Sequence, residues 1–395
     1  MKKLFKLSIV ASMALSSLYA SEASSVKEMF SNGEASGQVR LGYYNINPDS
    51  IGNTQTATAI GGQLKFETAS LHGFSVGTAL YTSQTIDVFS GDQNDADFSD
   101  FLASSEENYT EVGEAYINYN KGAFNIRIGR QLVDTPLADS DDIAMTPNTF
   151  EAVILSYTLK DLGLTIIGAN IQRMQGVDTG YTNVTTSSWM DTGDSSSNML
   201  AILYVNDMIE SSAWYYDVKK AAKAIYVDAS MNFAITDESA ITVSAQYLNE
   251  TESDASNIDG SIAGIMAEAS FSGLSAMVAY NELSVSSGKT IFEGIGGGSS
   301  YTNMHNLTAG TLDTDAKSFV ASVGYEFSGI NIFTAYGDFE ADSANTGHLT
   351  EIDAGISYEY NNGEADISLV YVNVEDKLLT NSGSDEIKVF ANYNF

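Results

Sequence analysis

The chain has 395 residues, no cysteine, and a formal charge of −33 at pH 7 from 18 basic and 51 acidic residues. A field of this sign repels nucleic acid and concentrates cations, which argues against a nucleic-acid partner. Exported soluble proteins often carry disulfides, so the absence of cysteine favours a sheet held by its own hydrogen bonds.

Residues 1–20 carry the pattern of a secretory signal peptide. Lys2, Lys3 and Lys6 form a positive start, and Leu7–Leu15 is a short apolar core. The apolar stretch is shorter than the roughly 20 residues that a membrane-spanning helix needs. Removing the segment with its three lysines leaves 15 basic and 51 acidic residues, a formal charge of −36.

Residues 21–395 form one predicted domain, because no linker or change of composition interrupts them. Segments with period-two alternation follow one another to the last residue, and we count about eighteen strands. They are Ser36–Asn45, Thr58–Ser70, Gly73–Ser83, Tyr109–Asn120, Ala123–Gln131, Phe150–Lys160, Leu162–Gln172, Ser197–Asn206, Glu210–Asp217, Lys223–Phe233, Ser239–Glu250, Gly260–Phe271, Gly273–Ser284, Ala316–Phe327, Gly329–Glu340, Thr350–Tyr360, Glu364–Glu375 and Ser384–Phe395. Most are close to the roughly 9–11 residues of tilted membrane strands.

The connections alternate between long and short. Gln84–Asn108 and Val285–Asp315 are long, whereas Asn120–Gly122 and Ser328–Gly329 are tight turns. Short periplasmic turns with long extracellular loops are typical of bacterial outer-membrane barrels. The predicted fold class is therefore all-β, a single transmembrane antiparallel β-barrel.

The alternation also assigns the two faces of the sheet. In the segment 316–327, Phe319 and Val323 oppose Ser318 and Ser322. Alternation alone leaves open a soluble barrel with its apolar face inside. The signal peptide, the sorted loops and the many aromatic residues near strand ends favour lipid outside. A barrel of about eighteen strands then encloses an aqueous lumen.

The connection Leu132–Thr149 is the third long loop. It is too long for a hairpin turn, and Pro136 and Pro147 stiffen it. Long loops of this kind are usually functional, so we expect it to fold inward as a pore constriction. Its four candidate constriction residues are Asp134, Asp139, Asp141 and Asp142. The alternative is a loop that caps the mouth with solvated aspartates.

Strand parity supplies the candidate lumen wall. The basic residues with inward parity are Arg40, Lys65 and Arg127, and the acidic ones include Glu67, Glu114, Asp228 and Asp353. Arg130 has the opposite parity unless a bulge reorients it. Loop aspartates facing the basic wall across the lumen would set a transverse field, and acidic rings favour cations. The net charge is explained equally well by solubility, or by loops adapted to a salty surface, as by a role in ion selectivity.

Three segments resemble the OprD-type porins and related major outer-membrane proteins of Gram-negative bacteria. They are Val26–Asn45, Gly129–Tyr157 and the Gly-rich Gly294–Met304, and the chain closes on the aromatic Phe395. The resemblance implies passive diffusion through an 18-stranded pore, often trimeric, with the third loop inside. It also implies that Phe395 is read by the outer-membrane assembly machinery. Relatives selective for carboxylates carry a ladder of basic residues, which is thin here.

We therefore expect an outer-membrane porin, in contact with lipid and lipopolysaccharide, that passes small hydrophilic solutes and prefers cations. One alternative is a channel selective for a carboxylate, amino acid or peptide. Another is a structural or adhesive barrel. A hydrolase would rest on Ser75 in Gly73–Gly77, which matches G-x-S-x-G but lacks the strand-to-helix turn of that motif.

No cofactor is expected. Asp92–Asp100 is rich enough in carboxylates for weak Ca²⁺ binding, but it lacks the glycine and final glutamate of an EF-hand, and a solvated acidic loop explains it better. His72, His305 and His348 lie in different connections, without the spacing of a zinc site.

Overall fold

The computed structural model describes residues 22–49, 52–91, 96–102, 108–177, 189–192, 196–236, 238–343, 346–379 and 382–395. The predicted signal peptide, residues 1–20, lies outside the described residues. So do residues 92–95 of the acidic segment that we considered for Ca²⁺.

The described chain forms one antiparallel sheet of nineteen strands in which neighbours in the sequence pair with each other. In chain order the strands are β1 (Glu34–Pro48), β2 (Gln55–Glu67), β3 (Phe74–Thr85), β4 (Tyr109–Lys121), β5 (Phe124–Gln131), β6 (Thr149–Leu159), β7 (Leu164–Gln175), β8 (Met190–Asp191), β9 (Ser197–Val205), β10 (Ile209–Val218), β11 (Ala222–Thr236), β12 (Ser239–Glu252), β13 (Gly260–Phe271), β14 (Leu274–Val285), β15 (Ala316–Phe327), β16 (Ile330–Ala341), β17 (His348–Tyr360), β18 (Ala365–Asp376) and β19 (Gly383–Asn394).

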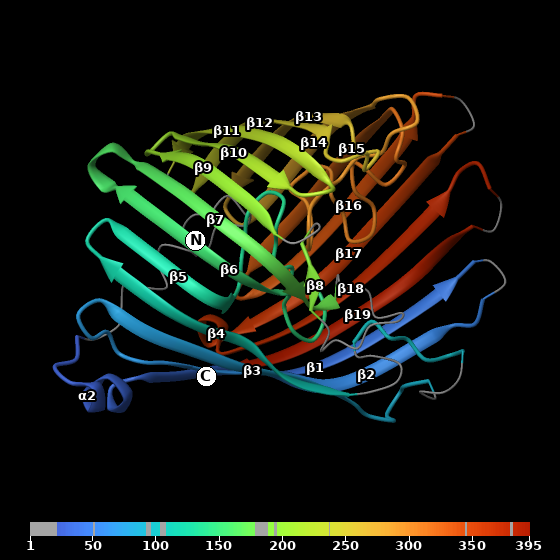
Figure 1. Ribbon diagram of the computed structural model, residues 1–395. Helices are drawn as coiled ribbons and strands as arrows, with labels where there is room; N and C mark the ends of the chain where they lie inside the picture. Colours follow the sequence, from blue (N-terminus) through green and yellow to red (C-terminus); the bar gives the residue numbers. More distant parts are fainter. Residues whose placement is uncertain are drawn as a thin grey trace.

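The sheet closes where its last strand meets its first. β19 pairs with β1 from Gln38↔Asn394 to Pro48↔Ser384, so the red β19 lies beside the blue β1 in Figure 1. The two-residue β8 pairs with the end of β7, and the rest of β7 pairs directly with β9. The other eighteen strands form the ring, which confirms the predicted all-β barrel. A closed ring leaves the ladder without an edge, as a lipid environment requires.

The long and short connections lie at opposite ends of the ring. At one end, the strands are joined by the described loops 132–148 and 286–315, and the ends of β3, β4, β7 and β9 that face the other long connections lie at the same end. Turns such as 122–123, 272–273 and 328–329 connect them at the other. The loop sidedness predicted from the sequence is confirmed.

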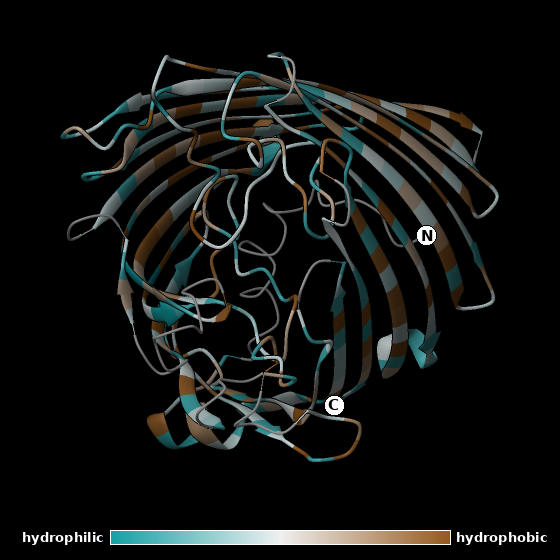
Figure 2. Ribbon diagram, turned by 90° about the vertical axis from the view of Figure 1, so that its right-hand side faces the viewer, coloured by the Kyte–Doolittle hydropathy of each residue, from teal (hydrophilic) through white to brown (hydrophobic). Residues whose placement is uncertain are grey.

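Exposure follows the period of two along the strands. In β3, Phe74, Val76 and Leu80 are exposed, whereas Ser75 and Tyr81 are buried. Figure 2 shows these stripes of alternating hydropathy along the strands, with loop segments inside their outline. Large apolar side chains therefore cover the outer surface, and the polar residues of the strands point inward together with an apolar cluster that includes Phe150 and Trp214. This arrangement suits lipid outside and water inside.

A short helix precedes the barrel, and we did not predict it. α2 (Val26–Ser31) begins after Ser25, whose hydroxyl accepts from the Glu28 N–H at 3.3 Å. The Glu28 carboxylate in turn accepts from the Ser24 N–H at 2.9 Å, an arrangement close to a capping box. In the described ranges, no helix is both long and apolar enough to span a bilayer.

Two glycines allow a matched test of the ladder. Gly62 in β2 has a φ of +123°, and a Cβ there would collide with the Gln38 carbonyl of β1. Gly62→Val should therefore cost on the order of 1–3 kcal/mol, because only glycine adopts this conformation without strain. The midpoint of urea unfolding in detergent micelles measures the loss.

Gly168→Ala in β7 is the control, because its Cβ would meet nothing within 4 Å. Its midpoint should match that of the wild-type protein. Equal midpoints for Gly62→Val and Gly168→Ala would contradict the strand register described for β1 and β2.

Candidate pore-lining site

The loop of residues 132–148 reaches the inner face of β1 through Arg40. The guanidinium donates to both carboxylate oxygens of Asp142, at 2.7 and 2.9 Å, and to the carbonyl of Ala144 at 2.5 Å. Its Nε donates to Asn392 Oδ1 on β19 at 2.8 Å, and Arg40 is only 6% exposed. A two-pronged contact of this kind fixes the orientation of the loop as well as its position.

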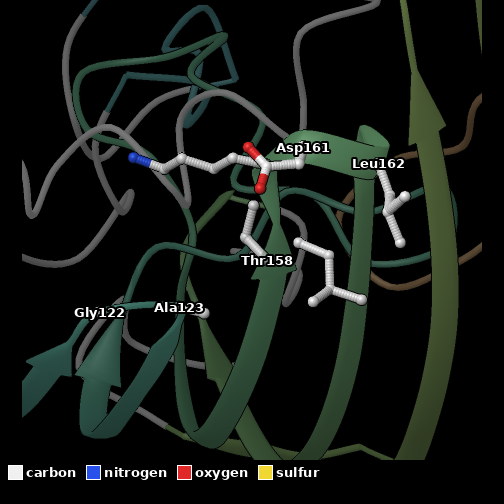
Figure 3. A pocket seen from close by; sticks show the side chains of 7 residues that line it. Gly122, Ala123, Thr158, Asp161 and Leu162 are labelled. Carbon is white, nitrogen blue, oxygen red and sulfur yellow. The ribbon is translucent and has the colours of Figure 1, made fainter.

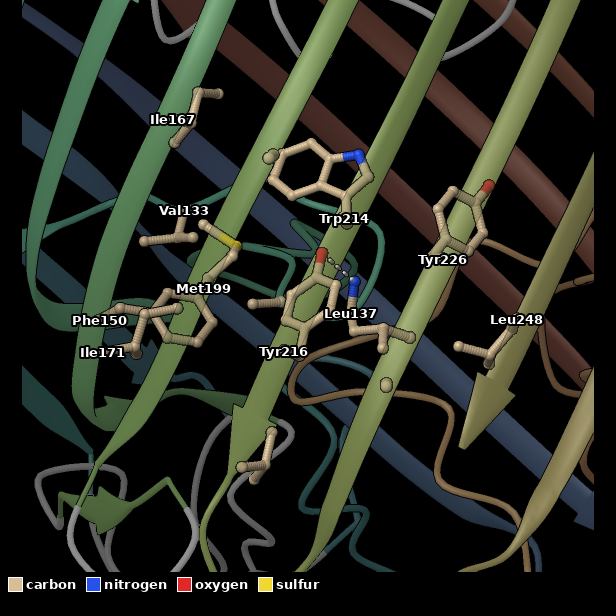
Figure 4. Packing of buried hydrophobic residues seen from close by; sticks show 14 of the residues in the cluster. Val133, Leu137, Phe150, Ile167, Ile171, Met199, Trp214, Tyr216, Tyr226 and Leu248 are labelled. Atoms are coloured by element: carbon tan, nitrogen blue, oxygen red, sulfur yellow. Dashed lines mark hydrogen bonds between the residues drawn. The ribbon is translucent and has the colours of Figure 1, made fainter. Parts of the chain in front are cut away.

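The same loop also contacts β10. The backbone N–H of Leu137 donates to the hydroxyl of Tyr216 at 3.4 Å, as the dashed line in Figure 4 shows. Leu137 belongs to an apolar cluster with Phe150, Met199 and Trp214. Seven strands, β2 to β7 and β9, separate β1 from β10 around the ring. One loop thus contacts two almost opposite walls.

A second loop, residues 286–315, supports the first. Ala138 and Ile295 form a parallel bridge. The Asp139 N–H donates to the Ile295 carbonyl at 3.1 Å, and the Ile295 N–H donates to the Leu137 carbonyl at 3.0 Å. Residues more than 150 positions apart are therefore held as one layer, which no local sequence pattern predicts.

The four predicted constriction aspartates lie in this layer. Asp142 binds Arg40, and its side chain is 43% exposed. Asp134 accepts from the Ser140 N–H at 3.3 Å, and Asp139 accepts from the Asp141 N–H at 2.8 Å. The structure thus groups the four residues, while their role in constriction stays a prediction.

The basic wall is paired more closely than we expected. Lys65 Nζ lies 2.9 and 3.1 Å from the carboxylate oxygens of Glu114, which also accepts from the hydroxyl of Tyr81. Arg127 stacks over Tyr116 with 4.2 Å between the guanidinium carbon and the ring centroid. Arg40 and Lys65 therefore bind carboxylates directly rather than only facing acids across the lumen. Such contact is favoured where water is scarce and attraction between charges is stronger.

A fourth inward base was missing from the predicted wall. Lys388 on β19 is 8% exposed, with its Nζ 3.4 Å from Glu386. Its parity in the last strand was a sufficient signal. The inward bases of the described strands are therefore Lys388 on β19, Arg40 on β1, Lys65 on β2 and Arg127 on β5. The first three of these strands are adjacent in the ring.

Arg130 does not join this set. It pairs in the ladder with the exposed Ala115, and its guanidinium stacks over Trp189 at 4.7 Å. Arg173 lies over the same ring at 5.5 Å and forms an ion pair with Glu151, which has the parity of outward-facing residues. No bulge has reoriented Arg130.

The remaining predicted acids also lie on the inner parity. Glu67 accepts from the Tyr116 hydroxyl at 2.9 Å, Asp228 accepts from Ser212, and Asp353 is 3% exposed. Asp228 and Asp353 lie on β11 and β17, away from the basic sector. The inner wall is therefore asymmetric in its bases only: inward bases occupy one sector, whereas inward acids lie both among them, as Glu67, Glu114 and Glu386 do, and elsewhere on the ring.

Loop residues add charge that the parity of strands could not reveal. Glu293 in the 286–315 loop accepts from the hydroxyl of Thr308. Burial raises the pKa of Glu293 against the opposing effect of that hydrogen bond.

Phe98 and Leu102 of the loop 86–108 pack on the inward Tyr44 of β1. The described residues Phe98 and Leu102 therefore contact the inner face at β1.

A hollow of about 610 Å³ lies at the other end of the barrel, beside the short turns. Thr158, Lys160 and Asp161 line it together with Gly122 and Ala123 (Figure 3). None of the predicted lumen residues lies there.

The hydrolase-like motif around Ser75 and the acidic segment 92–100 do not form a functional site in the described residues. Ser75 lies within β3, is 3% exposed and donates to Glu67 at 3.2 Å, whereas an elbow serine is exposed on a strand-to-helix turn. In the described part of the acidic segment, the carbonyl of Asp97 accepts from the Thr56 N–H. That bond fastens a loop to β2.

Comparison with known proteins identifies the family. The model of OprD, described as an outer membrane porin family, matches residues 28–395. No curated protein matches the chain. Pseudomonas aeruginosa OpdQ is 17% identical with a TM-score of 0.75, over 93% of this chain and 99% of that one. Acinetobacter baumannii OccAB3 is 12% identical with a TM-score of 0.79, over 92% and 99%.

A structure of Pseudomonas aeruginosa OpdK with vanillate is 15% identical, with a TM-score of 0.76 over 93% of this chain and 99% of that one. At such identities the structures show a shared fold. The family match covers almost the whole barrel, and it points to a channel rather than an enzyme. The chain belongs to the OprD family of outer membrane porins.

Proposed function

We propose that the barrel is a water-filled channel for passive diffusion of small hydrophilic solutes and ions, narrowed by the loop of residues 132–148. The observation that carries the proposal is the contact of this loop with both Arg40 on β1 and Tyr216 on β10. A segment attached to nearly opposite walls crosses the lumen between them. Its polar half, with Asp141 and Asp142, is the half that solutes would meet.

We also propose a preference for cations. Arg40 and Lys65 each bind a carboxylate, so much of the basic charge is neutralised locally. Asp228 and Asp353 lie on β11 and β17, two strands whose described residues include no inward lysine or arginine. The formal charge of −33 acts in the same direction, although salt screens exposed charges beyond roughly 10 Å.

The proposed partners follow from the family and the chain end. Phe395 exchanges backbone hydrogen bonds with Gly37 at 2.8 and 3.0 Å, and the residue is 56% exposed. An exposed aromatic at the closing strand suits recognition by the assembly machinery. Outer-membrane lipid and lipopolysaccharide would surround the apolar face. The proposed homotrimer rests on the family resemblance, and the size of the native complex in detergent tests it.

The second candidate is a channel selective for a carboxylate. The grouping of Arg40, Lys65, Arg127 and Lys388 on one sector favours it. A carboxylate solute that reduces ion current at low concentration, while a neutral sugar of equal size does not, would support this candidate over a general pore. A purely structural or adhesive barrel would pass no sugar in liposome swelling.

Ion selectivity tests the charge argument. Single channels in a planar bilayer under a KCl gradient should reverse at a potential that favours K⁺, because inward and loop carboxylates outnumber unneutralised bases. Replacing Asp139, Asp141 and Asp142 together by asparagine should weaken the preference. Anion preference in the wild-type channel would contradict the charge argument. Unchanged ion selectivity in the triple variant would mean that these aspartates are solvated turn residues without a role in selectivity.

Arg40→Gln tests the attachment of the loop to β1. The variant removes the paired hydrogen bonds from Arg40 to Asp142 and leaves the Asp142 carboxylate without its basic partner. Cation preference should therefore rise, and the open-channel current should become noisier because the loop loses its attachment to β1. Arg173→Gln is the control, because Arg173 also pairs with a carboxylate but on the outward parity. If both variants conduct like the wild-type channel, Arg40 does not hold a constriction.

A further inference from the structure

His305, Glu351 and Asp353 come together on the inner face of the barrel. Glu351 and Asp353 are two residues apart on β17, so both point inward, while the intervening Ile352 is exposed on the outer face. His305 comes from the loop of residues 286–315. One ligand atom from each of the three side chains lies within 4.8 Å of the others.

The hydrogen bonds in this cluster leave one buried oxygen unused. His305 Nδ1 lies 2.9 Å from Asp353 Oδ2, and Glu351 accepts from the backbone N–H groups of Asn306 and Leu307 at 2.9 and 2.7 Å. Asp353 is 3% exposed, and its Oδ1 has no hydrogen-bond partner among the described residues. Leaving such a buried oxygen unsatisfied destabilises the fold.

We propose that His305, Glu351 and Asp353 form a binding site for a divalent transition-metal cation of the Zn²⁺ type. One imidazole nitrogen and two carboxylates are ligands that such ions accept, and three protein ligands with water in the open position make a familiar coordination set. A divalent charge would balance the two carboxylates and occupy Asp353 Oδ1. The glutamate would keep its backbone hydrogen bonds, because each oxygen has a second lone pair.

The position of the cluster provides an entry path. The side chain of His305 is 34% exposed, whereas that of Asp353 is 4% exposed. The cation would therefore approach from the side of His305, with the carboxylates already in place behind it. The ring of His305 lies parallel to that of Phe333 on β16, with 6.5 Å between centroids, which restricts its orientation.

Two simpler arrangements compete with this site. In the first, the hydrogen bond between His305 and Asp353 only fastens the loop to β17. In the second, Glu351 and Asp353 share a proton, since their carboxyl groups are close enough to interact directly. Neither arrangement predicts zinc uptake that depends on His305.

The test is calorimetric titration of ZnCl₂ into the full-length protein in detergent, after metal removal with EDTA. One site per chain is expected, and His305→Gln and Asp353→Asn should each weaken its affinity on the order of 10–100-fold. His348→Gln is the matched control, because His348 Nε2 lies 3.3 Å from Asp338 and no described residue adds a third ligand beside them. The control should bind zinc like the wild-type protein.

His305→Gln keeps the test valid if Asp353→Asn fails to fold, because His305 is partly exposed. Heat-dependent mobility in gels verifies the barrel in each variant. Absence of a zinc site in the wild-type protein would overturn the proposal, as would equal zinc affinity in His305→Gln. Binding of Ca²⁺ alone, unchanged in His305→Gln, would also overturn it. Binding is measured without current, so its outcome is independent of the proposed channel function.

Discussion

The closed hydrogen-bond ladder is the constraint on which the rest of this structure depends. Lipid offers no partner for backbone N–H and C=O groups, so an open edge would be costly in the membrane. The pairing of β19 with β1 removes that edge. Once the ring is closed, side chains can only point outward or inward, and the period of two assigns each residue. Apolar residues such as Leu41 then face lipid, while Arg40 beside it faces the lumen.

The loop of residues 132–148 is attached to the strands by both charge and packing. The end of the 132–148 loop near Asp142 is fixed by the guanidinium of Arg40. The other half is fixed by apolar burial of Leu137 and by a backbone bridge at Ala138. The two attachments therefore use different interactions, a charge-assisted hydrogen-bond pair at Asp142 and apolar burial at Leu137.

The sequence predicted the strands well because both faces of a membrane strand are specified, and a slip of one residue would exchange them. It also placed Lys65 and Glu114 on the lumen side. The helix after Ser25 was missed although Ser25 and Glu28 have capping-box spacing. The bridge between Ala138 and Ile295, and the cluster around His305, join segments far apart in the chain, so no local pattern could reveal them.

The central claim is that the inward-facing side chains of the strands line a water-filled lumen, while the outward-facing side chains contact lipid. The chain has no cysteine, so single cysteines can report on each face without background. Ser322 and Val323 are adjacent in β15, and Val323 is 45% exposed on the apolar side. In intact membranes, Ser322→Cys should react with a water-soluble thiol reagent, and Val323→Cys should react only with a lipid-soluble one. The reverse pattern would contradict the account.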